Sequence, residues 1–290
     1  MKKTIFTLVI ALGAFAVINA QTLTSKKGVP ILPEAGEYGL GINATPFFSY
    51  AGNMFNGSSF NPGPSFNFTA NNPLTIYGKY FIDAHTAYRA KFQIGYTSVT
   101  DKNFVTKDAE WDDVNHEITV EDVGKWNDMM MAFGFGIEKR RGKGRVQGIY
   151  GAEATIMFGS SKRTYDYGNT WNPELVHFVT DFGDNLFDLP DGSPAQITEA
   201  KNGSTFGLDI RGFVGVEYFF APKISLGGEF GWGILLRSTG EGETKYEFME
   251  YSENTSAWFL SNNTTKTGGG GTFGLGVDNL SGAINLMFYF

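Results

Sequence analysis

Hydrophobic and polar residues alternate along much of this chain with a period of two, which is typical of β-strands with one apolar face. At the end of the chain, Ile284, Leu286, Phe288 and Phe290 share one face of such a strand, and Asn285 lies on the other. The segments that alternate in this way are 37–49, 73–82, 86–99, 128–138, 146–159, 205–220, 224–237 and 280–290. The pattern predicts an all-β protein with eight antiparallel strands.

The links between these predicted strands are alternately long and short. The short links are 83–85, 139–145 and 221–223. The long links are 50–72, 100–127, 160–204 and 238–279. Outer-membrane barrels alternate in this way, because their periplasmic turns are short and their extracellular loops are long. The sequence therefore predicts an eight-stranded antiparallel up-and-down transmembrane β-barrel over 36–290, with four long extracellular loops and three short periplasmic turns.

Each predicted strand has one face without charge and one face that carries charged or small residues. In 205–220, Phe206, Ile210 and Val214 lie on the apolar face, which we assign to lipid. The opposite faces of the strands carry ten charged residues: Lys79, Arg89, Lys91, Glu138, Glu153, Asp209, Arg211, Glu217, Glu229 and Arg237. A soluble barrel or sandwich with the apolar face inward would explain the alternation equally well. It would not explain the terminal Phe290 or the alternating link lengths.

The ten charged residues predict a closed interior. A barrel of eight strands is only wide enough to be filled by its own side chains. Five of the ten residues are basic and five are acidic, and opposite charges in so narrow a space would pair, because an isolated buried charge is very unfavourable. Glycines on the same face, such as Gly134 and Gly136, leave room for the long charged side chains. We therefore expect a plugged lumen and not a water-filled pore.

The beginning of the chain predicts export from the cytoplasm. Two lysines, Lys2 and Lys3, precede an apolar run over 5–18 and a small residue at Ala20, which is the pattern of a secretory signal peptide. We expect 1–20 to be a cleaved signal peptide and 21–35 to be a short periplasmic lead-in. The chain has no cysteine, and its net charge of −7 argues against nucleic acid as a partner.

Taken together, these features resemble the eight-stranded OmpX/OmpA-type outer-membrane barrels. The resemblance is architectural and not a motif match, and in it Phe288 and Phe290 would form the C-terminal assembly signal. Such signals commonly have a glycine five residues before the last aromatic residue, where this chain has Asn285. The resemblance implies a non-enzymatic protein of the cell outer membrane that contacts outer-membrane lipid and lipopolysaccharide and is inserted by the barrel-assembly machinery. It also implies no cofactor.

The resemblance leaves the role of the barrel open. Barrels of this kind serve as surface-interaction proteins or as structural and accessory subunits of outer-membrane complexes, with a protein partner or an extracellular ligand held by the loops. The charged lumen offers the alternative of a small-solute, porin-like channel. The long loops also carry aromatic residues, such as Trp171, Trp258 and Phe259, which either form a binding surface or pack the loops onto one another.

Enzymatic and metal-binding roles have weaker support in the sequence. Lipid-modifying barrels use a histidine on the lipid-facing wall, and no predicted strand carries one. Omptin-like proteases place His and Asp at the rim of ten strands, and His177, Asp181 and Asp184 could imitate such a site in 160–204. The acidic link 100–127 could attract calcium, but no spacing in it matches a calcium-binding loop. We predict no catalytic residue and no metal site.

Overall fold

The computed structural model describes residues 23–55, 68–70, 73–108, 118–171, 179–277 and 283–290. The described residues form one antiparallel sheet of 13 strands, one α-helix and a short 3₁₀ helix at Gly183–Asn185. The expected class, mostly antiparallel β, is confirmed. The predicted signal peptide at 1–20 lies outside the described residues.

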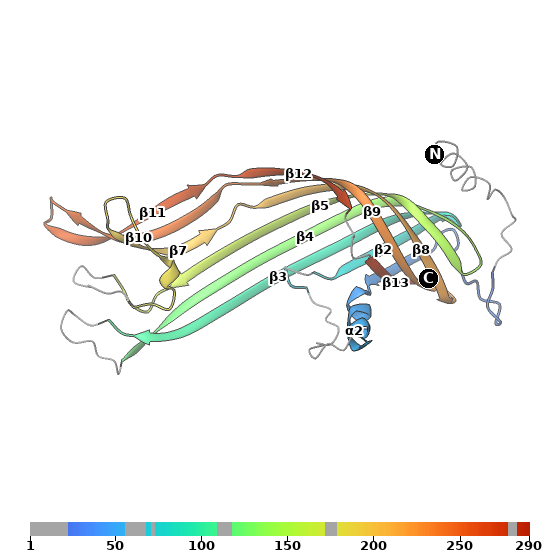
Figure 1. Cartoon of the computed structure of the whole chain (residues 1–290), viewed down its shortest axis with the longest axis horizontal. Helices are drawn as coiled ribbons and strands as arrows, with labels where there is room; N and C mark the ends of the chain where they lie inside the picture. The colour runs from blue at the N-terminus through green and yellow to red at the C-terminus, as the bar shows by residue number, and fades with distance from the viewer. Residues whose placement is uncertain (1–22, 56–67, 71–72, 109–117, 172–178, 278–282) are drawn as a thin grey trace.

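Eight of the strands form a closed cycle of antiparallel pairs, which we call the ring (Figure 1). Each strand of the ring pairs with the next one along the chain, and the last pairs with the first. The ring strands are β1 (Tyr38–Asn43), β2 (Thr75–Asp83), β3 (Thr86–Thr106), β4 (Thr119–Lys143), β5 (Val146–Asp166), β8 (Thr205–Ala221), β9 (Ile224–Thr239) and β13 (Ala283–Tyr289). They correspond in order to the eight segments found by alternation.

The expectation of only eight strands is wrong, because the long links contain five more. These are β6 (Leu186–Asp188), β7 (Pro194–Lys201), β10 (Gly242–Ser252), β11 (Ala257–Thr267) and β12 (Gly270–Val277). Where β5 continues past its partner β8, it pairs with β7, which in turn pairs with β10, and β10 pairs with β11. An open strand edge is a template for further pairing, so the long strands extend into a broad sheet beyond the ring (Figure 1).

The first predicted strand is too long. The strand β1 ends at Asn43, and the helix α2 spans Thr45–Phe55, so 45–49 are helical and not extended. The Thr45 backbone N–H donates to Oδ1 of Asn43 at 2.8 Å, which provides an acceptor where the helix begins. Pro46 follows in the first turn, where proline is tolerated. Among the described residues, no helix is both long enough and apolar enough to cross a membrane.

The three short turns are confirmed at one end of the ring. Two residues separate β2 from β3, β4 from β5, and β8 from β9. Gly144 and Lys223 in the second and third turns have positive φ angles of 69° and 60°, a backbone conformation that permits a two-residue reversal. The link predicted as 139–145 is shorter than expected, because β4 continues to Lys143.

The two faces of the ring differ sharply in chemistry. The outer face exposes large apolar side chains, among them Phe135 at 68%, Val214 at 58% and Trp232 at 56% of their surface. The inner face buries charged residues, such as Arg89 and Glu217. This arrangement is the reverse of a water-soluble protein, in which large apolar side chains are mostly inside and charges mostly outside.

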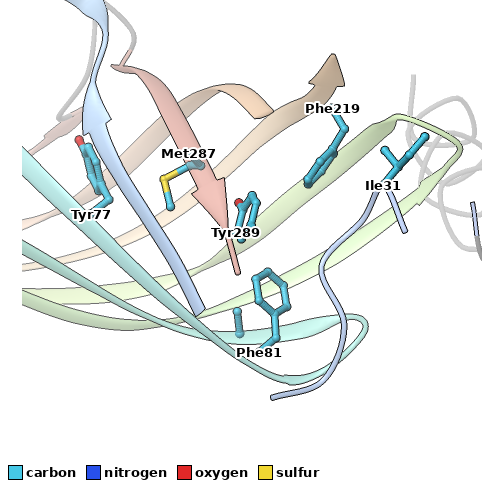
Figure 2. Packing of buried hydrophobic residues seen from close by; sticks show 7 residues of the cluster. Ile31, Tyr77, Phe81, Phe219, Met287 and Tyr289 are labelled. Atoms are coloured by element: carbon cyan, nitrogen blue, oxygen red, sulfur yellow. The ribbon is translucent and has the colours of Figure 1, made fainter. Parts of the chain in front are cut away.

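One cluster of buried hydrophobic residues lies at the end of the ring that carries the short turns (Figure 2). Phe81, Phe219 and Tyr289 point toward one another there, and Ile31 reaches them from the segment before β1. The Lys223 backbone N–H donates to the carbonyl oxygen of Ile31 at 3.1 Å, and Nζ of Lys223 donates to that of Leu32 at 2.9 Å. The residues expected to be a simple lead-in therefore pack under the ring.

Candidate functional site

Charged side chains from six ring strands meet inside the ring. Strands β2 and β3 supply the cations Lys79, Arg89 and Lys91; the remaining members are Glu138 and Arg140 from β4, Glu153 from β5, Arg211 and Glu217 from β8, and Glu229 from β9. We call these nine residues the charge network. They meet because the side chains of alternate residues in a strand point to the same face, and these residues have the inward position.

Arg89 is the centre of one half of the charge network, which lies farther from the short turns and which we call the upper half. Its Nη1 and Nη2 donate to the two carboxylate oxygens of Glu229 at 3.0 and 3.2 Å, a bidentate arrangement that fixes both side chains. Its Nε lies 3.0 Å from Oε2 of Glu153. Glu153 is also 2.7 Å from Nζ of Lys91, and Nη2 of Arg211 donates to Glu229 at 2.6 Å. Cations and carboxylates thus alternate across the interior.

Glu217 is the centre of the other half of the charge network, which lies nearer the short turns and which we call the lower half. Its carboxylate accepts hydrogen bonds from Nη2 of Arg140 at 2.8 Å, from Oγ of Ser225 at 2.6 Å and from the hydroxyl of Tyr289. Nζ of Lys79 lies 3.7 Å from Glu217 and 2.8 Å from Glu138, so this lysine links two carboxylates. The side chain of Glu217 is 1% exposed, so its charge depends entirely on these neighbours.

Aromatic rings pack against the guanidinium groups of the charge network. Arg89 lies 4.1 Å from the centroid of the Phe213 ring. Arg140 lies 4.6 Å from the ring of Phe81 and 5.2 Å from that of Phe219, in the hydrophobic cluster at the turn end. Cation–π contacts of this kind are favourable, above all where water is excluded. The interior of the ring therefore contains ion pairs in its middle part and aromatic rings at the end near the short turns.

A small residue makes the close packing possible. A Cβ atom placed on Gly134 would come within 2.8 Å of Cγ of Lys91, on the neighbouring strand β3. Any larger side chain at this position would displace the lysine that pairs with Glu153. The expectation that glycines leave space for long charged side chains describes this position correctly.

The structure brings eight of the ten predicted network residues together: Lys79, Arg89, Lys91, Glu138, Glu153, Arg211, Glu217 and Glu229. The placement of Arg237 in the network is wrong, because this residue lies toward the other end of β9, is exposed, and makes no ion pair within the described part of the chain. Asp209 is half-buried and lines a separate cavity with Arg237.

Sequence reasoning missed Arg140, which is one of the most deeply buried residues of the network. Arg140 falls within the predicted short link 139–145. Its position two residues after Glu138 gives it the same inward parity, and this signal could have placed it inside. Tyr289, next to the last residue, has inward parity in the same way.

The two residues of the predicted C-terminal signal lie on the outer face. Phe288 is 46% exposed and Phe290 is 70% exposed. The backbone of Phe290 pairs with that of Tyr38, with reciprocal N–H to oxygen distances of 2.9 Å, so the end of the chain joins the beginning of β1. The rings of Tyr38 and Tyr80 lie 4.9 Å apart beside it, which gives this end of the ring an aromatic rim.

The described part of the structure adds no support for the candidate enzymatic and metal sites. His177, the histidine of the omptin-like arrangement, lies outside the described residues, and Asp181 accepts a hydrogen bond from the side-chain amide of Asn103. No group of three or more acidic or histidine side chains within the described ranges is arranged to hold a metal ion. Of the loop aromatics, Trp258 and Phe259 are on β11 and are 52% and 45% exposed.

No protein-family model matches the chain, and no curated protein matches it. The features that bear on function are the ring, its two faces and the extended sheet.

Proposed function

We propose that this chain is a non-enzymatic, eight-stranded β-barrel of the bacterial outer membrane with a plugged lumen. In this proposal the barrel acts as an anchor, and the strands beyond it bind a partner at the cell surface or within an outer-membrane complex. The observation that carries the proposal is the closed cycle of eight strand pairs with apolar side chains outside and paired charges inside. In lipid, only a closed sheet leaves no unpaired edge.

The lengths of the strands support this division into an anchor and a projecting sheet. A strand needs about 9–11 residues to cross a bilayer. The strands β3, β4 and β5 have 21, 25 and 21 residues, so about half of each remains to project beyond the membrane. The hairpin of β10 and β11 projects with them, on the side opposite the short turns (Figure 1).

The tip of this hairpin is the surface that best fits a partner. Tyr251, Trp258 and Leu260 lie on one face of the hairpin, and each is 48–52% exposed. The rings of Tyr251 and Trp258 are 5.3 Å apart. Aromatic residues of this size are enriched in the centres of protein interfaces. Binding of a partner at this position would bury side chains that the isolated chain leaves in water.

Affinity purification from native outer membranes in mild detergent tests this role. We expect the wild-type chain to retain a stoichiometric partner, and the Trp258→Ala chain to lose it or to retain at least tenfold less, as truncation of a central aromatic residue does. Phe104→Ala is the matched control, because Phe104 is a 73% exposed aromatic residue near the end of β3. Equal recovery of the partner with Trp258→Ala and with wild type would contradict a role for the hairpin tip.

The membrane part of the proposal has its own test. Washing isolated outer membranes with urea or sodium carbonate removes peripheral proteins and leaves integral ones. We expect the chain to stay in the membrane pellet and to need detergent for its release. Release by the wash would contradict the assignment of the apolar outer face to lipid.

A further inference from the structure

Among the described strands, β12 pairs with a neighbour along only one of its two edges. Strand β12 pairs with the upper part of β9 from Val277↔Trp232 to Gly270↔Thr239, and no strand within the described ranges pairs with its other edge. On that side β1 has already ended at Asn43 and given way to the helix α2. An unpaired edge exposes backbone N–H and C=O groups, which lipid cannot satisfy.

A cavity of about 400 Å³ lies against this edge. It is lined by Met157, Asp209, Gly233, Leu235, Arg237, Gly274, Leu275 and Gly276. Leu235 has the inward parity of Glu229, whereas Leu275 pairs with Ile234 on the outer face and is 59% exposed. The other seven lining residues all have the inward parity, and Leu275 lies between Gly274 and Gly276 on β12, so the cavity lies on the inner side of the ring wall beside the edge of β12.

The two ends of the cavity differ in chemistry. Arg237 lies at the end away from the charge network, and it makes no hydrogen bond or ion pair with any described residue. Met157 and Leu235, which both have the inward parity, give the cavity apolar walls. Asp209 is also in the lining and already has an interaction of its own. An arginine that has no partner among the described residues and lies next to apolar walls suits an anionic head group attached to a hydrocarbon chain.

We propose that this cavity binds a single-chain anionic amphiphile, which enters from the membrane past the unpaired edge of β12. The head group, a phosphate or a carboxylate, pairs with Arg237, and the hydrocarbon chain lies along Leu235 toward Gly233 and Gly276. The four-residue step from Gly233 to Arg237 extends about 13 Å along β9, which accommodates a medium-length chain. This inference rests on the proposed barrel, because the ligand comes from the lipid around it.

The glycines of β12 provide a sharp test. A Cβ atom on Gly276 would meet no atom within 4 Å, so a leucine at this position fits without a backbone clash and fills cavity space. Gly271 lies on the same strand with the opposite parity, and a Cβ atom there makes only an ordinary contact of 3.7 Å. Gly271→Leu is therefore the matched control for Gly276→Leu.

The experiment is a titration of the purified full chain, in nonionic detergent, with dodecyl phosphate, followed by native mass spectrometry. Dodecyltrimethylammonium, which has the same chain and the opposite charge, is the control probe. We expect one dodecyl phosphate to bind, with about tenfold weaker binding in Arg237→Gln because a charge-assisted contact is lost. We expect Gly276→Leu to lose binding as well and Gly271→Leu to bind like the wild type.

Two results would overturn the inference. One is equal binding of the anionic and cationic probes, and the other is a Gly276→Leu chain that binds dodecyl phosphate as well as Gly271→Leu does. The unfolding midpoint of each variant shows whether it is folded, and a third variant, Leu235→Phe, reduces the cavity from β9 if Gly276→Leu fails to fold. A chain that resists the urea wash but binds no amphiphile refutes this inference alone. A chain that the wash releases refutes the barrel as well.

Discussion

Single residues matter most where a charge has been taken out of water. Glu217 holds Arg140 at 2.8 Å and accepts two further hydrogen bonds, from Ser225 and Tyr289. Burying a carboxylate and its cation carries a large desolvation penalty. This penalty is offset here because several partners share the carboxylate. Arg140 in turn lies over three aromatic rings, so the charge network and the hydrophobic cluster meet at this residue.

Glu217→Gln should therefore destabilise the protein strongly. The change leaves the buried Arg140 and Lys79 without one counter-charge, and removing one partner of a buried pair costs about 3–5 kcal/mol. Urea unfolding of the protein in detergent, followed by tryptophan fluorescence, measures the loss. Glu121→Gln is the control, because Glu121 pairs with Lys102 on the surface at 3.0 Å and its loss should cost no more than about 1 kcal/mol. Equal midpoints for the two variants would refute the structural role of Glu217.

At the scale of elements, the ring could be predicted and the strands beyond it could not. The ring strands have one apolar and one polar face, so their period of two is visible in the sequence. Strand β11 is exposed on nearly every residue, and its run of Asn and Thr after Leu260 shows no alternation. The helix α2 begins in an apolar run that is too short for periodicity to separate helix from strand. Asn43 and Pro46 were the available signals for it.

The attachment of β7 and β10 to the long strand β5 should depend weakly on pH. Glu199 on β7 lies 2.8 Å from Nζ of Lys162 on β5 and 3.2 Å from Nζ of Lys245 on β10. The hydrogen bond from Lys162 lowers the pKa of Glu199 below its ordinary value. A lowered pKa means that this stabilisation is present above the pKa of the unfolded chain, about 4.3, and is lost as the pH falls through the folded value.

We expect the protection factors of the amides of β7 and β10, which compare the intrinsic with the observed exchange rates, to decrease in wild type below about pH 4. The effect is small, well under about 1 kcal/mol, because both lysines are about half exposed to solvent. Hydrogen exchange from pH 3 to 7, compared with Glu199→Gln at each pH, isolates the contribution of this carboxylate. A difference between the two proteins that stays constant over this range would refute the assignment.

At the scale of the whole molecule, the sequence predicted most residues of the charge network but not where the network ends along the strands. The parity of the strands placed eight of the ten predicted residues correctly, because a closed ring brings all inward positions together. It also placed Arg237 there, because parity fixes a face but not a height along the strand. The contribution of Ile31 could not be foreseen, since packing of the lead-in under the ring is a long-range contact.

The proposed plugged lumen predicts that the reconstituted protein does not conduct ions. In planar bilayers at 1 M KCl we expect no conductance steps from the wild type. The double variant Arg89→Ala/Arg211→Ala removes two large side chains from the upper half of the charge network and should give small steps, if it folds. Discrete steps from the wild type would favour the alternative of a small-solute channel.

The most direct test of the central claim is the labelling of single cysteines in intact cells. The chain has no cysteine of its own, so each introduced thiol reports on one position. Thr255→Cys lies between β10 and β11, and His85→Cys lies in the short turn between β2 and β3; both positions are exposed. A membrane-impermeant maleimide should label Thr255→Cys in intact cells, and His85→Cys only after the outer membrane is permeabilised. Labelling of both positions in intact cells, or of neither, would contradict a barrel that spans the outer membrane with its long strands outside.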